Sequence, residues 1–141
     1  MKVRIQKVVP DVKTPSYANP GDAGFDLYAA EETIISPGQR MLVRSGIKMA
    51  VPEGYVGLIW DKSGRAAKDG LKTMAGVLDS GYRGEILIVM HNLSDKEVKI
   101  EKNHKVAQML IQPIHKAEFE EVESLDDTQR GEGGFGSSGL R

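Results

Sequence analysis

Short runs of apolar residues, several of them alternating with polar residues, recur along the chain and are separated by residues that favour turns. Asn19-Pro20-Gly21-Asp22 and Ser36-Pro37-Gly38 are two of these turn clusters. Many short strands broken in this way predict an all-β fold of the sandwich, jelly-roll or barrel kind. The runs with the pattern of strands are residues 3–9, 40–51, 55–60, 85–90, 97–100, 106–114 and 117–122.

One segment has the pattern of a short helix instead. Ser63 is a good N-cap residue, Ala66 and Ala67 favour a helix, and Gly70 stands where a left-handed C-cap residue would end it. The unpaired backbone N–H groups at such a helix start can bind an anion. The alternative is that Ser63 only caps a helix on the surface.

Length and composition are those of one globular domain. The chain has 141 residues and a formal net charge of −1, which differs from the basic character of most duplex-binding proteins. Because no apolar run is long enough to span a bilayer and the first residues alternate, we expect neither a membrane anchor nor a signal peptide. The absence of cysteine excludes disulfides and thiolate sites and is compatible with the cytoplasmic location that we expect.

Residues 130–139 are half glycine and yet contain one arginine, one phenylalanine and two adjacent serines. Glycine lets the backbone approach a ligand, the Arg130 guanidinium can hold phosphate oxygens, and the Phe135 ring can cover a base. The alternative is a disordered terminus, which such a composition commonly produces. We expect residues 1–125 to form the β domain and residues 126–141 to form a flexible glycine-rich segment.

Residues 76–85 have turn chemistry between two apolar runs, as a β-hairpin has. At a hairpin tip, backbone groups without a partner can bind a base edge, and a firmly held Asp79 can orient a water molecule. The alternative is that Asp79 and Gly81 only shape the turn. Tyr82 is open to either interpretation.

Three polar residues elsewhere are further candidates. Asp22 and Asp26 are four residues apart and hence on one face of an extended strand, where they could grip a hydrated Mg2+ carried by a triphosphate. Alternatively, Asp22 belongs to a turn and Asp26 anchors hydrogen bonds. Gln108 lies within an apolar strand, so its amide needs a hydrogen-bond partner.

Taken in order, five segments resemble the five ordered motifs of the trimeric deoxyuridine triphosphate nucleotidohydrolases, the dUTPases. The resemblance implies a jelly-roll-like β-clip or distorted barrel with one short helix, assembled as a homotrimer with shared active sites. It also implies Mg2+-assisted hydrolysis of dUTP to dUMP and pyrophosphate, which keeps uracil out of DNA and supplies dUMP for thymidylate synthesis. Nucleic acid and membranes are not expected partners. The five segments are residues 22–29, 62–64, 76–85, 106–108 and 130–139.

The resemblance also implies a role for each matching residue. Asp79 would activate the water that attacks the α-phosphorus, and Tyr82 would pack against the deoxyribose and exclude a 2′-hydroxyl. Asp22 and Asp26 would meet the hydrated metal, and the glycine-rich end would close over the substrate. The other substrate-binding residues would be Lys62, Ser63, Gly64, Thr73, Val77, Leu78, Leu87, Gln108, Arg130, Phe135, Gly136, Ser137 and Ser138.

The chain departs from the family pattern at Lys62, where an arginine is common. Lysine lacks the planar fork of arginine, and Arg65 is the candidate to compensate for it. In addition, Asn103-His104-Lys105 replaces a common glycine, acid and arginine, and Asn103 can adopt the left-handed backbone that a turn needs there. Two rival functions are a dCTP deaminase-type relative and a non-enzymatic β domain that binds single-stranded RNA.

Overall fold

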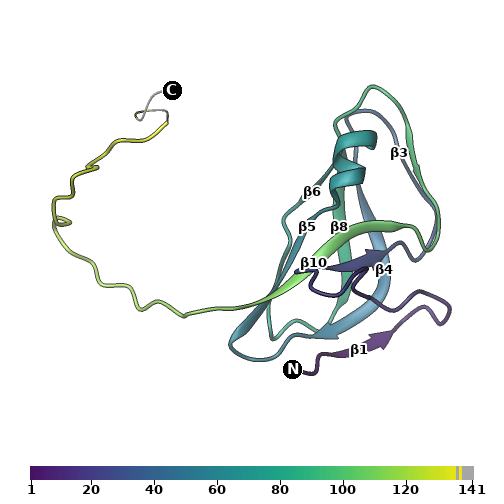
Figure 1. The fold of residues 1–141 in the computed structure, drawn as a ribbon, viewed down its shortest axis with the longest axis horizontal. Coiled ribbons are helices and arrows are strands. Elements are labelled where there is room, and N and C mark those ends of the chain that lie inside the picture. Colours follow the sequence, from purple (N-terminus) through teal and green to yellow (C-terminus); the bar gives the residue numbers. More distant parts are fainter. Residues whose placement is uncertain (136, 138–141) are drawn as a thin grey trace.

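The computed structural model describes residues 1–135 and 137, and its regular elements are almost all antiparallel strands (Figure 1). The prediction of an all-β fold with one short helix is confirmed. The strands are β1 (Arg4–Lys7), β2 (Phe25–Tyr28), β3 (Thr33–Ile35), β4 (Arg40–Ala50), β5 (Tyr55–Asp61), β6 (Leu71–Met74), β7 (Val77–Leu78), β8 (Glu85–Asn92), β9 (Val98–Ile100) and β10 (Lys105–Pro113).

The strands form two four-stranded sheets and one two-stranded sheet, in the orders β1-β4-β8-β6, β2-β10-β5-β7 and β3-β9. Alternation along strands such as β6 and β8 turns one face toward a common core, whereas β2 is buried on both faces and β1 is exposed. On β8, Ile86 and Ile88 are buried while Leu87 between them is exposed. Side chains of all three sheets share this core, with Ile88, Leu27 and Ile100 among them. The arrangement is therefore an open sandwich of sheets rather than a closed barrel.

Six of the predicted strands are present near their predicted positions, but the run 117–122 is wrong. Alternation of Glu with Phe119 and Val122 imitates a strand, yet both side chains are exposed and no strand of the described residues pairs with the run. The predicted runs also do not include β2, β3, β6 and β7. Each of these strands has four residues or fewer, which is too short for a period of two to stand out.

The hairpin predicted over residues 76–85 is wrong in its pairing. β7 pairs with β5, whereas β8 lies between β4 and β6, so the segment passes from one sheet to the other. Asp79 follows β7 directly, and the turn after it is closed by the Tyr82 N–H, which donates to the Asp79 carbonyl over 3.1 Å. As a consequence, β7 is an edge strand.

The predicted helix is present as a short, wide turn. It starts at Ser63 and Gly64 and continues as the π-helix η1 (Arg65–Asp69). Gly70 has φ +66° and donates its N–H to the Arg65 carbonyl, which confirms the left-handed C-cap. No side chain caps the start, so the N-cap predicted for Ser63 is wrong. Ser63 already lies within the helical turn, whereas an N-cap residue has non-helical dihedral angles.

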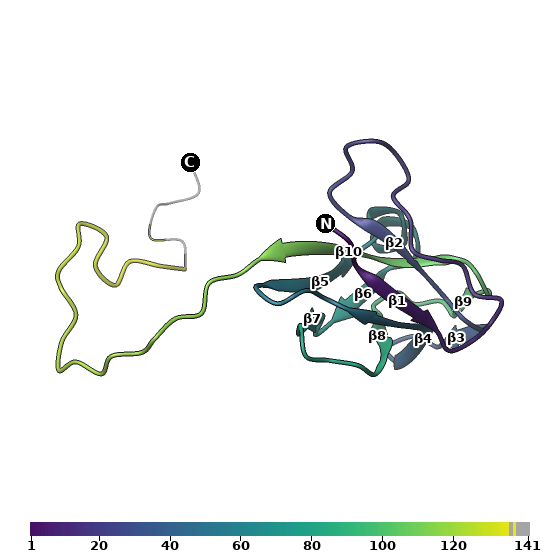
Figure 2. The same ribbon diagram turned by 90° about the horizontal axis from the view of Figure 1, so that it is seen from below.

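After β10 the chain leaves the body of the molecule, and Figure 2 shows the same separation from a second side. Residues 114–135 contain no helix or strand, and Phe119 and Phe135 are almost completely exposed. Two residues predicted to bind substrate, Gly136 and Ser138, lie outside the described residues. Within the described part of the chain, no helix is long and apolar enough to cross a membrane.

Candidate active site

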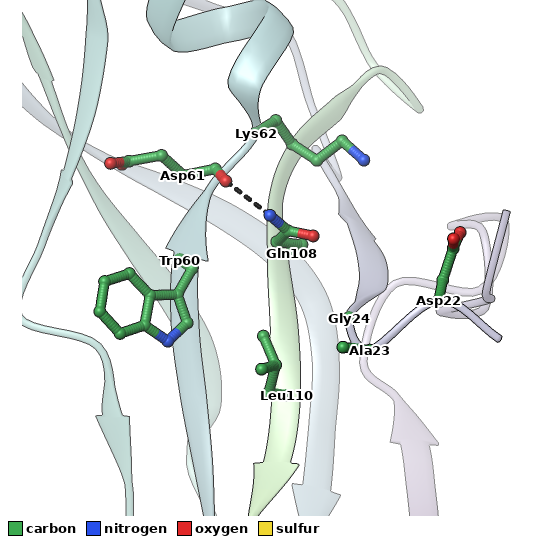
Figure 3. Close-up of a pocket in the computed structure, with 8 residues that line it drawn as sticks. All are labelled: Asp22, Ala23, Gly24, Trp60, Asp61, Lys62, Gln108 and Leu110. Carbon is green, nitrogen blue, oxygen red and sulfur yellow. Dashed lines mark hydrogen bonds between the residues drawn. The ribbon is translucent and has the colours of Figure 1, made fainter.

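Three of the predicted motifs meet at one hollow, which we call the Gln108 hollow (Figure 3). It forms because β10 lies between β2 and β5, so that Gln108 stands beside Asp26 on one side and Trp60 on the other. Its volume of about 600 Å³ falls in the range of small-molecule sites. The residues that line it are Asp22, Ala23, Gly24, Trp60, Asp61, Lys62, Gln108 and Leu110.

Gln108 has the hydrogen-bond partner that its position in an apolar strand requires. Its Nε2 donates to the Asp61 carbonyl over 2.8 Å (Figure 3). Its Oε1 faces Gly24, where an added Cβ would come within 2.7 Å of this oxygen and displace the carboxamide. The carboxamide is therefore fixed at one end and presents an acceptor in the hollow.

Asp26 is 2% exposed and is held between two lysines. Lys62 Nζ donates to Oδ1 over 2.6 Å, and Lys105 Nζ lies 2.6 Å from Oδ2 as an ion pair without the alignment of a hydrogen bond. Burial raises the pKa of Asp26, but the two ammonium groups lower it by more, so the pKa lies below its ordinary value. The carboxylate in turn raises the pKa of Lys105. Asp26 is thus a charged anchor that fixes both lysines.

Asp22 and Asp26 share no partner in this structure, contrary to the prediction from their spacing. Asp22 lies in an exposed turn, where its Oδ2 accepts from the Asn19 backbone N–H over 2.9 Å. The turn before β2 breaks the strand alternation that would have placed the two carboxylates on one face. Both oxygens of Asp26 face ammonium groups, so a metal role does not fit Asp26. Among the described residues, no three His, Asp or Glu side chains form a possible metal site.

Asp61 is a site residue that the sequence interpretation did not identify. Its carboxylate accepts from the Thr73 backbone N–H over 2.6 Å, from the Thr73 hydroxyl over 2.7 Å and from Lys72 Nζ over 2.7 Å. Burial raises the pKa of Asp61, and these donors lower it by more, to below its ordinary value. Asp61 therefore ties the end of β5 to β6.

Thr73 does not fit the substrate contact predicted for it. It is 5% exposed, and its hydroxyl is committed to Asp61. Along β6, Leu71 and Thr73 point inward while Lys72 and Met74 point outward, as the period of a strand requires.

Arg65, the predicted replacement for an arginine at position 62, does not line the Gln108 hollow. Its Nη1 donates to Asp69 over 2.8 Å and its Nε to the Lys105 carbonyl over 3.1 Å, while Nη2 lies 3.5 Å from His104 Nδ1. These contacts hold the guanidinium away from the Gln108 hollow, whose lining includes Lys62 but not Arg65.

A second hollow of about 190 Å³, the Asp79 hollow, brings together the residues predicted to bind the base and sugar and to activate water. Two residues that line it have a restricted backbone. Ala75 adopts the left-handed region with φ +60°, and Gly76 cannot carry a side chain, because a Cβ there would lie 2.7 Å from the Ile59 carbonyl oxygen. The Tyr82 hydroxyl donates to the Glu85 carbonyl over 3.0 Å, which fixes the ring. The predicted residues that line this hollow are Val77, Leu78, Asp79, Tyr82 and Leu87.

One chain does not bring all predicted site residues together. No residue lines both the Gln108 hollow and the Asp79 hollow. The third group lies in the segment after β10, where Arg130 Nε donates to the Gly133 carbonyl over 2.8 Å and Ser137 N–H donates to the Gly134 carbonyl over 3.0 Å. Most of the predicted residues thus fall into three groups within the described chain, whereas Asp26, Ser63, Gly64 and Thr73 line neither hollow.

Comparison with known proteins identifies the family. A family model described as dUTPase matches residues 11–139. The chain belongs to the dUTPase family. It is 44% identical to the deoxyuridine 5′-triphosphate nucleotidohydrolase of Hydrogenobaculum sp., with full coverage of both chains, and 44% identical to that of Thermobifida fusca, with 99% of this chain and 79% of the relative covered.

Solved dUTPase structures have the same fold. The Staphylococcus bacteriophage 80alpha dUTPase with dUpNHpp superposes with a TM-score of 0.92 at 28% identity, covering 99% of each chain. A mutant dUTPase from phage phi11 of S. aureus, described as coordinating a structural Mg(II) ion, gives a TM-score of 0.81 at 25% identity over 88% of this chain and 98% of that one. The family resemblance predicted from the five motifs is confirmed.

Proposed function

We propose that this dUTPase-family chain hydrolyses dUTP to dUMP and pyrophosphate at sites assembled from more than one copy, with Asp79 as the carboxylate that activates water. Family membership and the activity in the names of its relatives support the reaction. The observation that supports sites shared between copies is that the Asp79 hollow and the Gln108 hollow are separate within one chain. A homotrimer closes such heterologous contacts into a ring.

Uracil and deoxyribose fit the chemistry of the Asp79 hollow. Because β7 is an edge strand, the backbone groups on its outer side are free to pair with the polar edge of a base. Cytosine would offer a different donor and acceptor pattern and leave buried groups unpaired. The fixed ring of Tyr82 would pack against the sugar and leave no room for a 2′-hydroxyl, so UTP would be rejected.

The phosphates fit the chemistry of the Gln108 hollow of another copy. Lys62, fixed by Asp26, supplies a positive charge, and Gln108 lies beside it. The first backbone N–H groups of the helical turn, at Ser63 and Gly64, follow Lys62 directly in the chain and are suited to phosphate oxygens, although neither residue lines the Gln108 hollow. Placement of the α-phosphorus in line with a water held by Asp79 is the main catalytic contribution, since phosphoryl transfer needs geometry and charge neutralisation rather than a covalent intermediate.

Magnesium fits as an ion that arrives on the triphosphate with part of its water shell. Asp22 is the exposed carboxylate at the Gln108 hollow that can accept hydrogen bonds from such waters. When bound, the ion would neutralise charge on the phosphate oxygens. The residues of the chain hold the nucleotide and the water.

The segment after β10 serves in this proposal as a lid. Phe135 would cover the uracil, and Arg130 with residues 136–138 would contact the terminal phosphates. Its extension away from the body supports a reach to another copy (Figure 1). Closure would exclude water other than the attacking molecule.

The test is pyrophosphate release from dUTP, UTP, dCTP and dTTP with Mg2+. We expect release from dUTP alone at an appreciable rate. Ammonia release from dCTP would instead support the deaminase-type function. Salt-dependent binding of single-stranded RNA without dUTP hydrolysis would support the RNA-binding domain.

A further inference from the structure

The carboxylate of Glu85, the first residue of β8, is held by two residues of β4. Arg44 Nε lies 3.2 Å from each of its oxygens, Arg44 Nη2 donates to Oε2 over 2.9 Å, and the Gly46 backbone N–H donates to Oε1 over 2.9 Å. A forked arginine contact together with a backbone donor leaves a carboxylate little freedom to move. We call Arg44, Gly46 and Glu85 the Glu85 clamp.

The backbone donor of the Glu85 clamp depends on a bulge in β4. Residues 45–47 of β4 lie opposite the single residue Ile86 of β8. Gly46 within the bulge has φ +69°, and its carbonyl accepts from the Val8 N–H over 2.8 Å, so the bulge is also joined to the segment after β1. Because a bulge changes the direction in which backbone groups point, it can direct the Gly46 N–H at Glu85.

The main chain of Glu85 fixes the ring of Tyr82. The Tyr82 hydroxyl donates to the Glu85 carbonyl over 3.0 Å, and the ring lies against Gly84, where an added Cβ would come within 2.2 Å of the hydroxyl oxygen. Tyr82 is 43% exposed, so a ligand can reach the ring while the hydroxyl holds it. Tyr82 and Glu85 line the Asp79 hollow, whereas Arg44 lines neither this hollow nor the Gln108 hollow. An effect of Arg44 on a ligand in the Asp79 hollow therefore has to pass through other residues.

We propose that Arg44 and Glu85 are positioning residues that set the place of the Tyr82 ring and thereby the discrimination between deoxyribose and ribose. The inference rests on the proposed function, in which Tyr82 packs against the deoxyribose. A ring excludes a 2′-hydroxyl only if it cannot move back, which requires that it be held to within about 0.5 Å. The Glu85 clamp supplies this restraint, so Arg44 determines specificity without lining the hollow.

The experiment measures the ratio of kcat/KM for dUTP to kcat/KM for UTP. We expect Arg44→Ala to lower this ratio about tenfold, the effect of weakening one hydrogen bond, because a looser ring admits ribose. Arg44→Lys can keep one contact with Glu85 and should lower the ratio less. The control is Val43→Ala on the same strand, which removes buried apolar contacts and destabilises the fold but leaves the Glu85 clamp intact, so the ratio should not change.

A double-mutant cycle tests the route from Arg44 to the sugar. Tyr82→Phe keeps the ring but removes the hydroxyl that bonds to Glu85. If Arg44 acts through this hydrogen bond, Arg44→Ala should change the ratio little in a Tyr82→Phe background, because the restraint is already lost. An equal fall of the ratio in both backgrounds would overturn the inference, since Arg44 would then act by another route.

Fluorine NMR of the protein labelled with 3-fluorotyrosine follows the ring without any reaction. The Tyr82 signal, identified by its absence in Tyr82→Phe, should move toward its position in the unfolded chain in Arg44→Ala and stay in place in Val43→Ala. An unmoved signal, or a ratio equal to that of the control, would overturn the inference; if Arg44→Ala does not fold, Arg44→Lys is judged by the same criteria. A wild type that hydrolyses neither nucleotide would contradict the proposed function, whereas the signal would still show whether the Glu85 clamp holds the ring.

Discussion

The Gln108 hollow and the Asp79 hollow differ in how their polar groups are satisfied. In the Gln108 hollow, Asp61 and Gln108 have partners within the chain, and Asp26 beneath Lys62 is held by two ammonium groups. Asp79 is exposed, and its carboxylate makes no hydrogen bond or ion pair with the residues that the structure describes. A carboxylate with partners holds a shape, whereas one without them can hold water. The Gln108 hollow is therefore suited to positioning the substrate, and the Asp79 hollow is suited to activating water.

Replacement of Asp79 tests this division most strongly. Asp79→Asn keeps the shape of the side chain but removes the base, so we expect kcat to fall by about 10²–10⁴-fold while the affinity for dUpNHpp is retained. Single-turnover kinetics and calorimetry measure the two quantities. Asp95→Asn, at another exposed turn, is the control and should have wild-type kinetics. An Asp79→Asn enzyme with near-normal turnover would show that another group activates the water.

Truncation after Gln129 tests whether either hollow works without the third group of residues. Because residues 114–135 contain no strand or helix, the truncated chain should fold with an unchanged denaturation midpoint. We expect kcat/KM for dUTP to fall by about 10²-fold, the cost of losing closure and placement. Full activity of the truncated protein would refute the lid.

Mixed oligomers test whether the two hollows come from different copies. Asp79→Asn and Gln108→Ala chains, each nearly inactive alone, are unfolded together and refolded in equal amounts. If each site takes Asp79 from one copy and Gln108 from another, about a quarter of the sites regain both groups, since each group is drawn independently. Activity near that fraction of wild type is the expected result. No recovery in verified mixed oligomers would place both hollows of a site in one copy.

Asp26→Asn tests whether Asp26 holds Lys62 and Lys105 in place, and the free energy of unfolding is the quantity measured. The pKa of Asp26 is lowered in the folded state, so its contribution is present above the unfolded pKa, near pH 4, and is lost as the pH falls through the folded pKa. We expect the variant to lose about 2 kcal/mol of unfolding free energy at pH 7, less than the roughly 3–5 kcal/mol of a fully buried pair because both lysines reach solvent.

Urea denaturation between pH 3 and pH 7 measures this difference. The wild type should approach the Asp26→Asn variant as the pH falls from about 4 through the lower folded-state pKa, below which Asp26 is protonated in both states. Asp11→Asn is the matched control, since Asp11 also pairs with a lysine, Lys102, but at the surface. Its denaturation midpoint at pH 7 should change little. A wild type and an Asp26→Asn variant of equal stability at pH 7 would show that the anchor contributes nothing.

The two hollows also differ in how much of each could be predicted from the sequence. Asp79, Tyr82 and Leu87 line one hollow as expected, because the turn and the β8 alternation that place them are local. Local pattern does not reveal that β7 pairs with β5, or that Asp61 accepts from Thr73, because these contacts depend on which strands become neighbours.

The pairing of charged side chains could not be predicted from local sequence either. The sequence places Asp26 and Lys62 36 residues apart, and only the neighbouring positions of β2, β5 and β10 bring them within 2.6 Å. The spacing of Asp22 and Asp26 suggested a shared partner because it assumed one continuous strand. The fold begins that strand at Phe25 and leaves Asp22 in the preceding turn.

Lys62→Arg gives the smallest expected effect and sharpens the role of the Gln108 hollow. An arginine could keep one N–H donor on Asp26 and offer a second to a phosphate oxygen, which the single ammonium of Lys62 cannot do in a fixed plane. We expect KM for dUTP to fall by about two- to fivefold with kcat nearly unchanged, because the added contact binds ground state and transition state alike. Lys105→Arg is the control: it also faces Asp26 but does not line the Gln108 hollow, so KM should not fall. A lower KM in both variants would mean that the gain comes from the charge around Asp26 rather than from contact with phosphate at Lys62.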